Sequence, residues 1–529
     1  MKLRADVCIL GSGVAGGVVA EELLDAGLGD VLMVEAGSPV VMRDTRTWYD
    51  VFTAGLNPFA ALSYEESDYE NAGRTPIRLK GRHLRARGGS TLHWAGLSYR
   101  LKPEDFRLAS NTGQGLDWPI AYADLEPCYA LSESTLQVAG EASDPGHPPR
   151  SGPFPLPPFP AQEIEGPFIQ AMRDLGFSTQ HACWARNSRS IHGMSECLRT
   201  GTCEYCPVGG RFTGDQLIAR LSERPGFRLL TDTLCLKLQF SSRERAASAE
   251  LLERATGERH SVEAGRFVIC AGGVESPKLL LASQNEWWPK GVGNQSGRLG
   301  RALTDHVYQK CSGRSSQANG SRLANQLWFN TTASRHFDDL STQAAGKFLL
   351  TPEYRFLPLV ERMSEGRPTA EIVRDLERSC DHAVQFQLEQ HPSEANFIEL
   401  GKERDSIGLP KTVIHHTLTR QAESAARQAR TTCEAILREM GCTALSWNQA
   451  RLSSHISGTC RMSDSPASGV VDKDLRVHET RNVHVCSSAV FPSIGAVNPT
   501  VTIVALAHRL GRHLGQELKG PADRERSAP

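Results

Sequence analysis

A glycine-rich turn between a short apolar strand and a helix is the feature that most constrains the fold. Val7 to Leu10 predict a buried strand, and Gly11-Ser12-Gly13-Val14-Ala15-Gly16 follows it as a G-x-G-x-x-G turn. A helical stretch comes next, and Val31 to Glu35 predict a second strand. Glu35 lies 19 positions after Gly16, close to the spacing of a carboxylate that accepts from a ribose hydroxyl. The combination predicts a βαβ unit that binds a dinucleotide.

Two further units of this kind lie far along the chain. Arg266 to Gly273 predict an apolar strand that ends in glycines, before a helix with Pro277 in its first turn. Val483 to Cys486 predict another strand, before a helix from Val501 to Leu514. We therefore expect an α/β, Rossmann-like nucleotide-binding domain assembled from discontinuous segments, namely residues 1–110, 185–310 and 446–520.

The remaining segments, 111–184 and 311–445, predict a substrate-binding domain in a protein that is α+β overall. Residues 383–388 alternate in polarity, residues 406–410 predict a turn, and a helix runs from about Arg420 to Met440 and is closed by Gly441. This pattern predicts an antiparallel sheet covered by helices. The proline-rich residues 145–160 predict an extended surface segment, and residues 521–529 a disordered tail.

Composition excludes several classes of function. The chain has 529 residues, 59 basic and 60 acidic side chains, and a formal charge of -1, so its charge gives no basis for nucleic-acid binding. No stretch reaches the roughly 20 apolar residues that a membrane helix requires. The first strand begins within a few residues of Met1, so we expect no signal peptide and a cytoplasmic location, unless the protein is exported with a partner.

Three groups of residues carry the predicted chemistry. Gly88, Gly89 and Ser90, followed by His93 and Trp94, suit a backbone that cradles a phosphate or a flavin ring; a tight bend in the core is the alternative. His455 is the predicted base, because a neutral imidazole can take a hydroxyl proton near pH 7 while a hydride leaves the carbon. Asn498 precedes Pro499, so its amide either donates to a substrate oxygen or caps the next helix.

The chain contains 14 cysteines, and most stand singly in apolar surroundings, such as Cys8, Cys270 and Cys486. We expect these to be small buried residues and not halves of disulfides. Three others cluster at Cys197, Cys203 and Cys206. Three interpretations of this cluster stay open: an iron-sulfur cluster, a zinc site with His192 as a fourth ligand, or free or disulfide-paired thiols.

Taken together, the motifs resemble the glucose-methanol-choline (GMC) family of FAD-dependent alcohol oxidoreductases. The resemblance rests on the first glycine turn with Glu35, on Gly88 to Thr91, on Gly300-Arg301-x-x-x-Asp305-His306, on His455-x-x-Gly458-Thr459 and on Asn498-Pro499-Thr500. It implies FAD as cofactor, His455 as general base and Asn498 as partner of the substrate hydroxyl. It also implies cofactor contacts at Cys235, Ala271, Val490 and Thr500, and some members link flavin covalently at the position of His93.

The cysteine segment is similar to that of the catalytic subunits of bacterial membrane-linked glucose, gluconate and fructose dehydrogenases. Those glucose dehydrogenases carry a three-iron cluster on three cysteines, with one more residue between the second and third than Cys203 and Cys206 have here. The similarity implies a [3Fe-4S] cluster, a cytochrome subunit, a small exported partner and the periplasmic face of the inner membrane.

Three functions follow as hypotheses. The first is FAD-dependent oxidation of a sugar or polyol hydroxyl, with hydride transfer to flavin N5 and electrons leaving through the cysteine cluster to a cytochrome or quinone. The second is a soluble oxidase of an aminosugar or another natural-product alcohol, with oxygen as acceptor. The third is a catalytic-type subunit that acts mainly within a membrane-associated complex.

Overall fold

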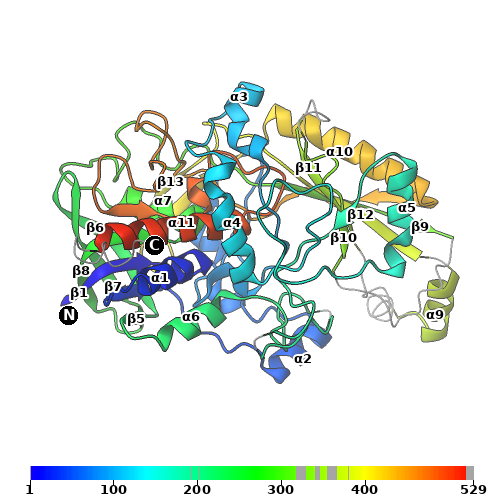
Figure 1. Ribbon diagram of the computed structural model, residues 1–529, viewed down its shortest axis with the longest axis horizontal. Coiled ribbons are helices and arrows are strands. Elements are labelled where there is room, and N and C mark those ends of the chain that lie inside the picture. The colour runs from blue at the N-terminus through cyan, green and yellow to red at the C-terminus, as the bar shows by residue number, and fades with distance from the viewer. Residues whose placement is uncertain are drawn as a thin grey trace.

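The computed structural model describes residues 2–191, 193–200, 202–316, 329–339, 346–353, 366–378 and 380–519, and the strands in these ranges form four sheets (Figure 1). The largest has seven strands in the order β5-β2-β1-β8-β7-β6, with β17 paired to β8. Its strands are β1 (Lys2–Leu10), β2 (Val31–Val34), β5 (Phe227–Leu230), β6 (Thr233–Ser242), β7 (Arg245–Glu253), β8 (Arg259–Ile269) and β17 (Val483–Val485).

This sheet is parallel where it carries the glycine turn. β1 pairs in parallel with β2 on one side and β8 on the other, and β2 continues to β5. The first half of β8 pairs antiparallel with β7, and its last residues pair in parallel with β17. Segments more than 200 residues apart in sequence therefore end at one edge of the sheet, where ligands of open α/β sheets bind.

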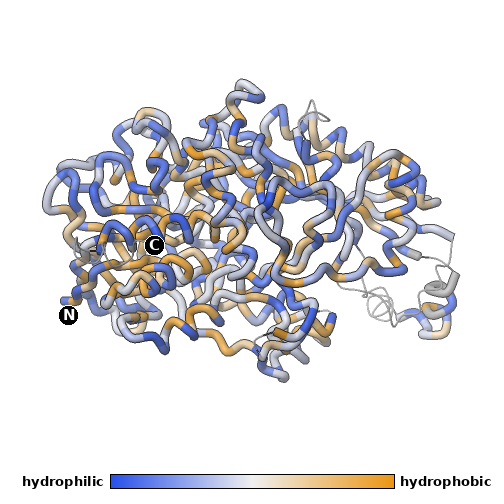
Figure 2. Tube along the Cα trace, in the orientation of Figure 1, coloured by the Kyte–Doolittle hydropathy of each residue, from blue (hydrophilic) through white to orange (hydrophobic). Residues whose placement is uncertain are grey.

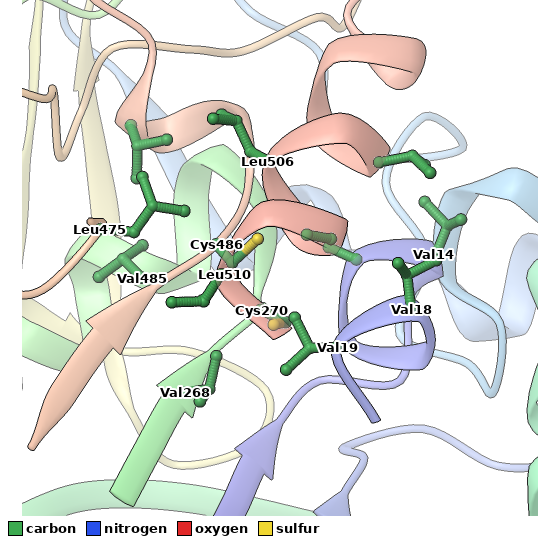
Figure 3. Close-up of a cluster of buried hydrophobic side chains, with 14 of the residues drawn as sticks. Val14, Val18, Val19, Val268, Cys270, Leu475, Val485, Cys486, Leu506 and Leu510 are labelled. Atoms are coloured by element: carbon green, nitrogen blue, oxygen red, sulfur yellow. The ribbon is translucent and has the colours of Figure 1, made fainter. Parts of the chain in front are cut away.

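Helices cover the strands and bury their apolar side chains. The helices are α1 (Val14–Asp25), α2 (Thr45–Ala54), α3 (Leu108–Thr112), α4 (Tyr122–Leu136), α5 (Gly166–Asp174), α6 (Gly214–Ser222), α7 (Gly272–Ala282), α9 (Thr369–Arg378), α10 (Arg420–Glu439) and α11 (Thr500–Leu518). α1 packs against α11, and Val19 of α1 and Leu510 of α11 belong to the same buried cluster as Cys270 and Cys486, which follow β8 and β17 (Figure 3). Hydrophobic stretches also run through the opposite end of the molecule (Figure 2), so each end has apolar side chains of its own.

The second sheet has five strands in the order β11-β12-β9-β15, with β16 paired to β9. Its strands are β9 (Val307–Ser315), β11 (Phe348–Glu353), β12 (Cys380–Leu388), β15 (Cys442–Trp447) and β16 (Arg451–Leu452). All of its pairings are antiparallel. Val384, Phe386 and Leu388 are fully buried in the same apolar cluster as residues of α10, whereas the intervening Gln385 and Gln387 are half-buried. The face opposite α10 is therefore polar.

Two smaller sheets connect the parts. β13 (Phe397–Arg404) and β14 (Pro410–His415) form a hairpin, and β14 pairs in parallel with β3 (Tyr69–Asn71). β10 (Thr332–Ala333) pairs with β4 (Gln180–His181). Gly408 in the hairpin turn has φ +80°, a conformation that glycine adopts without steric cost.

The α/β fold with a parallel nucleotide-type sheet and a helix-covered antiparallel sheet is confirmed. Two details of the prediction were wrong. α7 begins at Gly272, whose φ of +71° turns the chain directly from β8 into the helix, so Pro277 lies inside the helix and not in its first turn. In the segment 145–160, Leu156 and Phe159 are 1% and 4% exposed, because they join the core of the molecule, so this segment is not merely a surface strand.

The structure also bears on the predicted domain boundaries, the single cysteines and the membrane helix. The predicted boundaries at 310 and 445 fall inside β9 and β15, and β16 lies beyond the second of them. Cys8, Cys270 and Cys486 are buried and free, as predicted. The tail 521–529 lies outside the described residues. Within the described ranges, no helix is both long and apolar enough to cross a membrane.

Candidate active site

The glycine turn leaves the N-terminus of α1 open. Gly13 is the N-cap of α1, and no side chain caps the first N–H groups. A Cβ atom at Gly13 would meet nothing within 4 Å, whereas a Cβ atom at Gly16 would lie 2.2 Å from the carbonyl oxygen of Gly11. Gly16 is thus required for packing within the turn, while Gly13 borders open space. Free N–H groups at a helix N-terminus, with space before them, suit a pyrophosphate.

Glu35 follows β2 and lies against the same turn. Its Oε2 accepts from the Ser12 backbone N at 2.9 Å and from the Ser12 hydroxyl at 2.7 Å, and its Oε1 accepts from the Gly37 N at 2.8 Å. Burial raises the pKa of the Glu35 carboxyl, and the hydrogen bonds from Ser12 and Gly37 oppose that rise. The carboxylate is held where a ribose next to the turn could reach it.

The second glycine segment packs directly on the first. Gly88 N donates to Ser12 O at 3.2 Å, and a Cβ atom at Gly89 would lie 3.1 Å from the Gly13 Cα atom. Both glycines have positive φ, +98° and +60°. Ser90 is exposed beside them, and its hydroxyl accepts from Leu84 N. The two segments form one backbone-lined cradle.

His93 and Trp94 continue this cradle. Trp94 Nε1 donates to Phe212 O at 2.8 Å. His93 Nδ1 is buried and has no partner among the described residues, and burial lowers the pKa of His93 to about 4. An unpartnered ring nitrogen beside an uncapped helix N-terminus fits a polar cofactor ring next to a phosphate group. These residues fit FAD.

The other predicted cofactor residues lie at or near the ends of strands or helices. Ala271 follows β8, and Val490 is fully buried in a short turn after β17. Thr500 is the first residue of α11, and Cys235 is half-buried in β6. A Cβ atom at Gly273 would lie 2.2 Å from Ile456 O, so the start of α7 touches the segment that carries His455.

His455 lies between a second imidazole and the amide of Asn498. His306 Nδ1 and His455 Nδ1 are 2.9 Å apart, and the ring planes are at 81°. Asn498 Nδ2 is 3.3 Å from His455 Nε2. α11 has no side-chain cap, so Asn498 faces the imidazole instead of capping the helix.

These contacts determine the proton positions on the two rings. His306 Nε2 is 3.0 Å from Gly495 O, and a carbonyl can only accept, so this nitrogen carries the proton of the neutral ring. His306 Nδ1 is then an acceptor, and His455 Nδ1 must donate to it. In neutral His455 the remaining nitrogen, Nε2, is therefore an acceptor, and its lone pair faces the Asn498 amide.

Both imidazoles are held neutral. Burial lowers the pKa of His306 to about 4. The pKa of His455 lies well below 6.5, first because of burial and then because of the neighbouring His306 and His83. A histidine of this kind is deprotonated at neutral pH and can accept a proton at Nε2.

Asp305 shapes the segment around the imidazole pair. Its carboxylate accepts from the backbone N of His455 at 2.8 Å, of His306 at 2.7 Å and of Ser454 at 2.9 Å. Burial raises the pKa of Asp305 to about 7, against the effect of these hydrogen bonds. Asp305 and His306 belong to the motif Gly300-Arg301-x-x-x-Asp305-His306, but the sequence predicted no role for either residue.

Gln387 is the other residue that sequence reasoning missed. It projects from the polar face of β12, and its Nε2 donates to Asn498 Oδ1 at 3.3 Å and to Ala496 O at 3.1 Å. Because the Asn498 oxygen accepts from Gln387, its NH₂ group faces His455. In the sequence, only the alternating polarity of residues 383–388 pointed to this region. The alternation predicted a strand but did not show that Gln387 faces Asn498.

The three clustered cysteines are half-buried and free. The Cys203 sulfur accepts from Arg186 Nη1 at 3.1 Å, and burial raises the pKa of the Cys197 thiol. Among the described residues, some groups of three His, Cys, Asp or Glu have possible metal-ligand atoms within 4.8 Å of one another. These cysteines do not belong to such a group. His192, the fourth ligand of the zinc hypothesis, lies outside the described residues.

The parallel sheet with its cradle and the adjacent imidazole and amide define a nucleotide-dependent oxidoreductase of alcohols. Family models described as GMC oxidoreductase match residues 160–308 and 392–507. The 6'''-hydroxyparomomycin C oxidase of Streptomyces lividus is 31% identical, with 97% of this chain and 92% of that protein covered. The chain belongs to the GMC oxidoreductase family.

Other relatives span the whole chain. The fructose dehydrogenase large subunit of Gluconobacter japonicus is 27% identical over 98% of this chain and 99% of that protein. The paromamine 6'-oxidase of Streptomyces fradiae is 30% identical over 97% and 92%. The crystal structure of pyridoxine 4-oxidase from Mesorbium loti shares the fold, with a TM-score of 0.68 at 20% identity over 97% and 99%. Family membership supports FAD as cofactor; no comparison supports an iron-sulfur cluster.

Proposed function

We propose that the protein oxidises a hydroxyl group of a sugar or sugar-like polyol, with His455 as general base. The observation that carries the proposal is the unprotonated Nε2 of His455, whose lone pair faces the Asn498 amide nitrogen at 3.3 Å. An oxygen bound between these groups can lose its proton to Nε2 while the amide donates to it. Bound FAD supplies the oxidant, which accepts a hydride from the carbon.

The other residues bind and position. Gly13 and the first turn of α1 present backbone N–H groups to the cofactor phosphates, and Glu35 accepts from its ribose. Gly11, whose N–H donates to Val34 O, and Gly16 allow the tight turn that places them there. Gly88, Gly89 and Ser90 hold the part of the cofactor nearest the substrate, with His93 and Trp94 beside it. His306 fixes the tautomer of His455, and Gln387 fixes the orientation of the Asn498 amide.

The substrate class follows from the polar face of the antiparallel sheet. Tyr308, Gln385, Gln387 and Thr351 lie on the face that reaches Asn498, and their hydroxyl and amide groups can bind a polyhydroxylated molecule. Relatives named for fructose and for aminosugar alcohols agree with this class.

The electron acceptor is a separate question. An oxygen-using oxidase is favoured by the 30% and 31% identity to relatives that are named oxidases. A cytochrome or quinone acceptor is favoured by the relative named as a dehydrogenase large subunit, which also suggests partner subunits. Peroxide release per turnover, compared with the rate in the presence of a dye acceptor and no oxygen, distinguishes the two.

The replacement His455→Ala tests the base. We expect anaerobic flavin reduction by a sugar alcohol to slow by about a thousandfold while FAD stays bound, because general base catalysis contributes about 10²–10⁴ in rate. His513→Ala, at the other end of α11, is the matched control and should reduce at the wild-type rate. An unchanged rate in His455→Ala would remove this residue from the mechanism.

A further inference from the structure

Arg451 lies at the edge of the polar sheet face, and Arg82 is close enough to Arg451 and Arg78 for their charges to lower its pKa. These three residues are called the arginine cluster. Arg451 in β16 is directly opposite Tyr308 in β9, and its guanidinium carbon is 4.5 Å from the Tyr308 ring centroid. Tyr308 is in turn directly opposite Gln387 in β12, which contacts Asn498. Opposite residues of antiparallel strands share a face. One row of side chains therefore joins the arginine cluster to the catalytic amide.

The length of this row matches a small polyol. Arg451, Tyr308 and Gln387 lie on three neighbouring strands, so the row spans two strand spacings, about 10 Å. A chain of six carbons, with its reacting hydroxyl at His455 and Asn498, would place its other end near Arg451. The cluster is positioned to contact the far end of a substrate.

Arg82 connects the cluster to the cofactor side. Its guanidinium is half-buried and lies close enough to those of Arg451 and Arg78 for their charges to lower its pKa. Burial, and then the charge of Arg451, lowers the pKa of Arg82. The Arg82 backbone also lies close enough to the ring of His93 to oppose part of the lowering of its pKa. Arg82 thus lies between His93 and the polar sheet face.

The positive charge of the cluster is only partly balanced. Among ion pairs between described residues, none includes Arg78, Arg82 or Arg451. Two acids are near: Glu353 is paired with Lys310 at 3.1 Å, and the exposed Glu204 attracts Arg82. Among the described residues, the three arginines and Lys310 therefore lie near two acidic side chains, Glu353 and Glu204. Gathered guanidinium groups repel one another, and an anion placed among them relieves that repulsion.

We propose that this cluster binds an anionic group, a carboxylate or a phosphoryl group, at the far end of a polyhydroxy substrate. The substrate class is then an acidic sugar derivative, and the ammonium group of an aminosugar is repelled. The assignment of the oxidised hydroxyl rests on the proposed function, whereas the binding of the anion does not.

Four ligands with one six-carbon skeleton test the proposal on the FAD-loaded protein. D-glucitol is neutral, D-gluconate carries a carboxylate, D-glucitol 6-phosphate carries a phosphoryl group and 1-amino-1-deoxy-D-glucitol is cationic. By calorimetry we expect gluconate, the phosphate ester or both to bind at least about tenfold more tightly than glucitol, and the amine most weakly. Whichever anion binds better identifies the preferred group, and added salt should narrow the difference.

Arg451→Gln and Arg82→Gln should reduce the anion preference to within about twofold without changing the affinity for glucitol. Arg427→Gln, on the exposed side of α10, removes one positive charge elsewhere and should keep the preference. Because Arg451 is exposed, its replacement remains informative if Arg82→Gln does not fold. The proposal would be overturned if the amine and gluconate bound equally, if no ligand bound, or if the preference for anions survived both replacements.

The same ligands separate the two proposals. If glucitol reduces the flavin but anions bind no better, the arginine site is refuted and the proposed function stands. If anions bind through Arg451 but no ligand of the series reduces the flavin, the arginine site stands and the proposed function loses its support.

Discussion

The two sides of the proposed active site differ in what they offer to a ligand. On the cofactor side, residues 11–16 and 88–90 present backbone, and what matters is the absence of side chains at Gly13, Gly16 and Gly89. On the substrate side, β9, β11 and β12 present alternate side chains, such as Tyr308 and Gln387.

Substitutions should therefore affect the two sides differently. A backbone cradle is lost when one added methyl group fills it, since there is no rotamer that could move the new atom away. A face built from side chains loses one hydrogen bond at a time. We therefore expect large, all-or-none effects on the cofactor side and graded effects on the substrate side.

The largest effect is expected for Gly16→Ala. Its Cβ atom would lie 2.2 Å from Gly11 O, so we expect a destabilisation of about 3 kcal/mol and loss of bound FAD. Thermal unfolding and the flavin absorbance of the purified protein measure both. Wild-type stability in this variant would show that the turn can relax.

Gly13→Ala is its matched control. This Cβ atom meets no protein atom within 4 Å, so the apoprotein should unfold as the wild type does. FAD affinity should still fall, by about tenfold, because the methyl group enters the space proposed for the phosphates. Unchanged FAD affinity would mean that the cofactor does not approach Gly13.

A smaller effect is expected for Gln387→Leu on the substrate side. The replacement removes the hydrogen bonds to Asn498 Oδ1 and Ala496 O, so the amide can rotate and kcat should fall about tenfold with FAD still bound. Gln385→Leu lies on the same face but contacts Tyr308 and Thr351, so it should raise KM more than it lowers kcat. Identical changes in both variants would refute a positioning role for Gln387.

The smallest effect is expected from pH. Because the pKa of His455 lies well below 6.5, the base stays deprotonated as the pH falls from 8 to 6.5, and kcat/KM should be level over that range. The acid limb should begin below pH 6.5. A limb centred at or above pH 6.5 would contradict a buried, neutral base.

The same histidines link stability to pH. His83, His93 and His306 have pKa values of about 4 in the folded protein, so the unfolded chain takes up their protons near pH 6.5. Above pH 6.5 these histidines are neutral in both states and do not affect the free energy of unfolding. Between pH 6.5 and pH 4 the free energy of unfolding falls by up to about 1.4 kcal/mol per pH unit for each histidine. Asp305, raised to about 7, acts in the opposite direction and offsets part of the loss. Chemical denaturation at several pH values measures the balance.

Features that lie within short segments could be predicted from the sequence. The strand, turn and helix around Gly11, the carboxylate at Glu35 and the helix ending before Gly441 follow from local spacing and backbone preference, and the structure has each of them. Local preferences failed to predict the start of the helix that contains Pro277, because the positive φ of Gly272 begins this helix earlier. They also failed to predict the burial of Leu156 in the segment 145–160, because distant residues cover it.

Which side chains meet depends on how distant segments pack, so the sequence did not predict these contacts. His306 and His455 are 149 residues apart, and Gln387 and Asn498 are 111 residues apart, yet these contacts set the tautomer of His455 and the orientation of the Asn498 amide. The row from Arg451 to Gln387 depends on strand register, and a shift of one residue would turn every side chain of a strand to the opposite face. Backbone motifs are written in neighbouring residues, whereas contacts between side chains depend on how the whole chain packs.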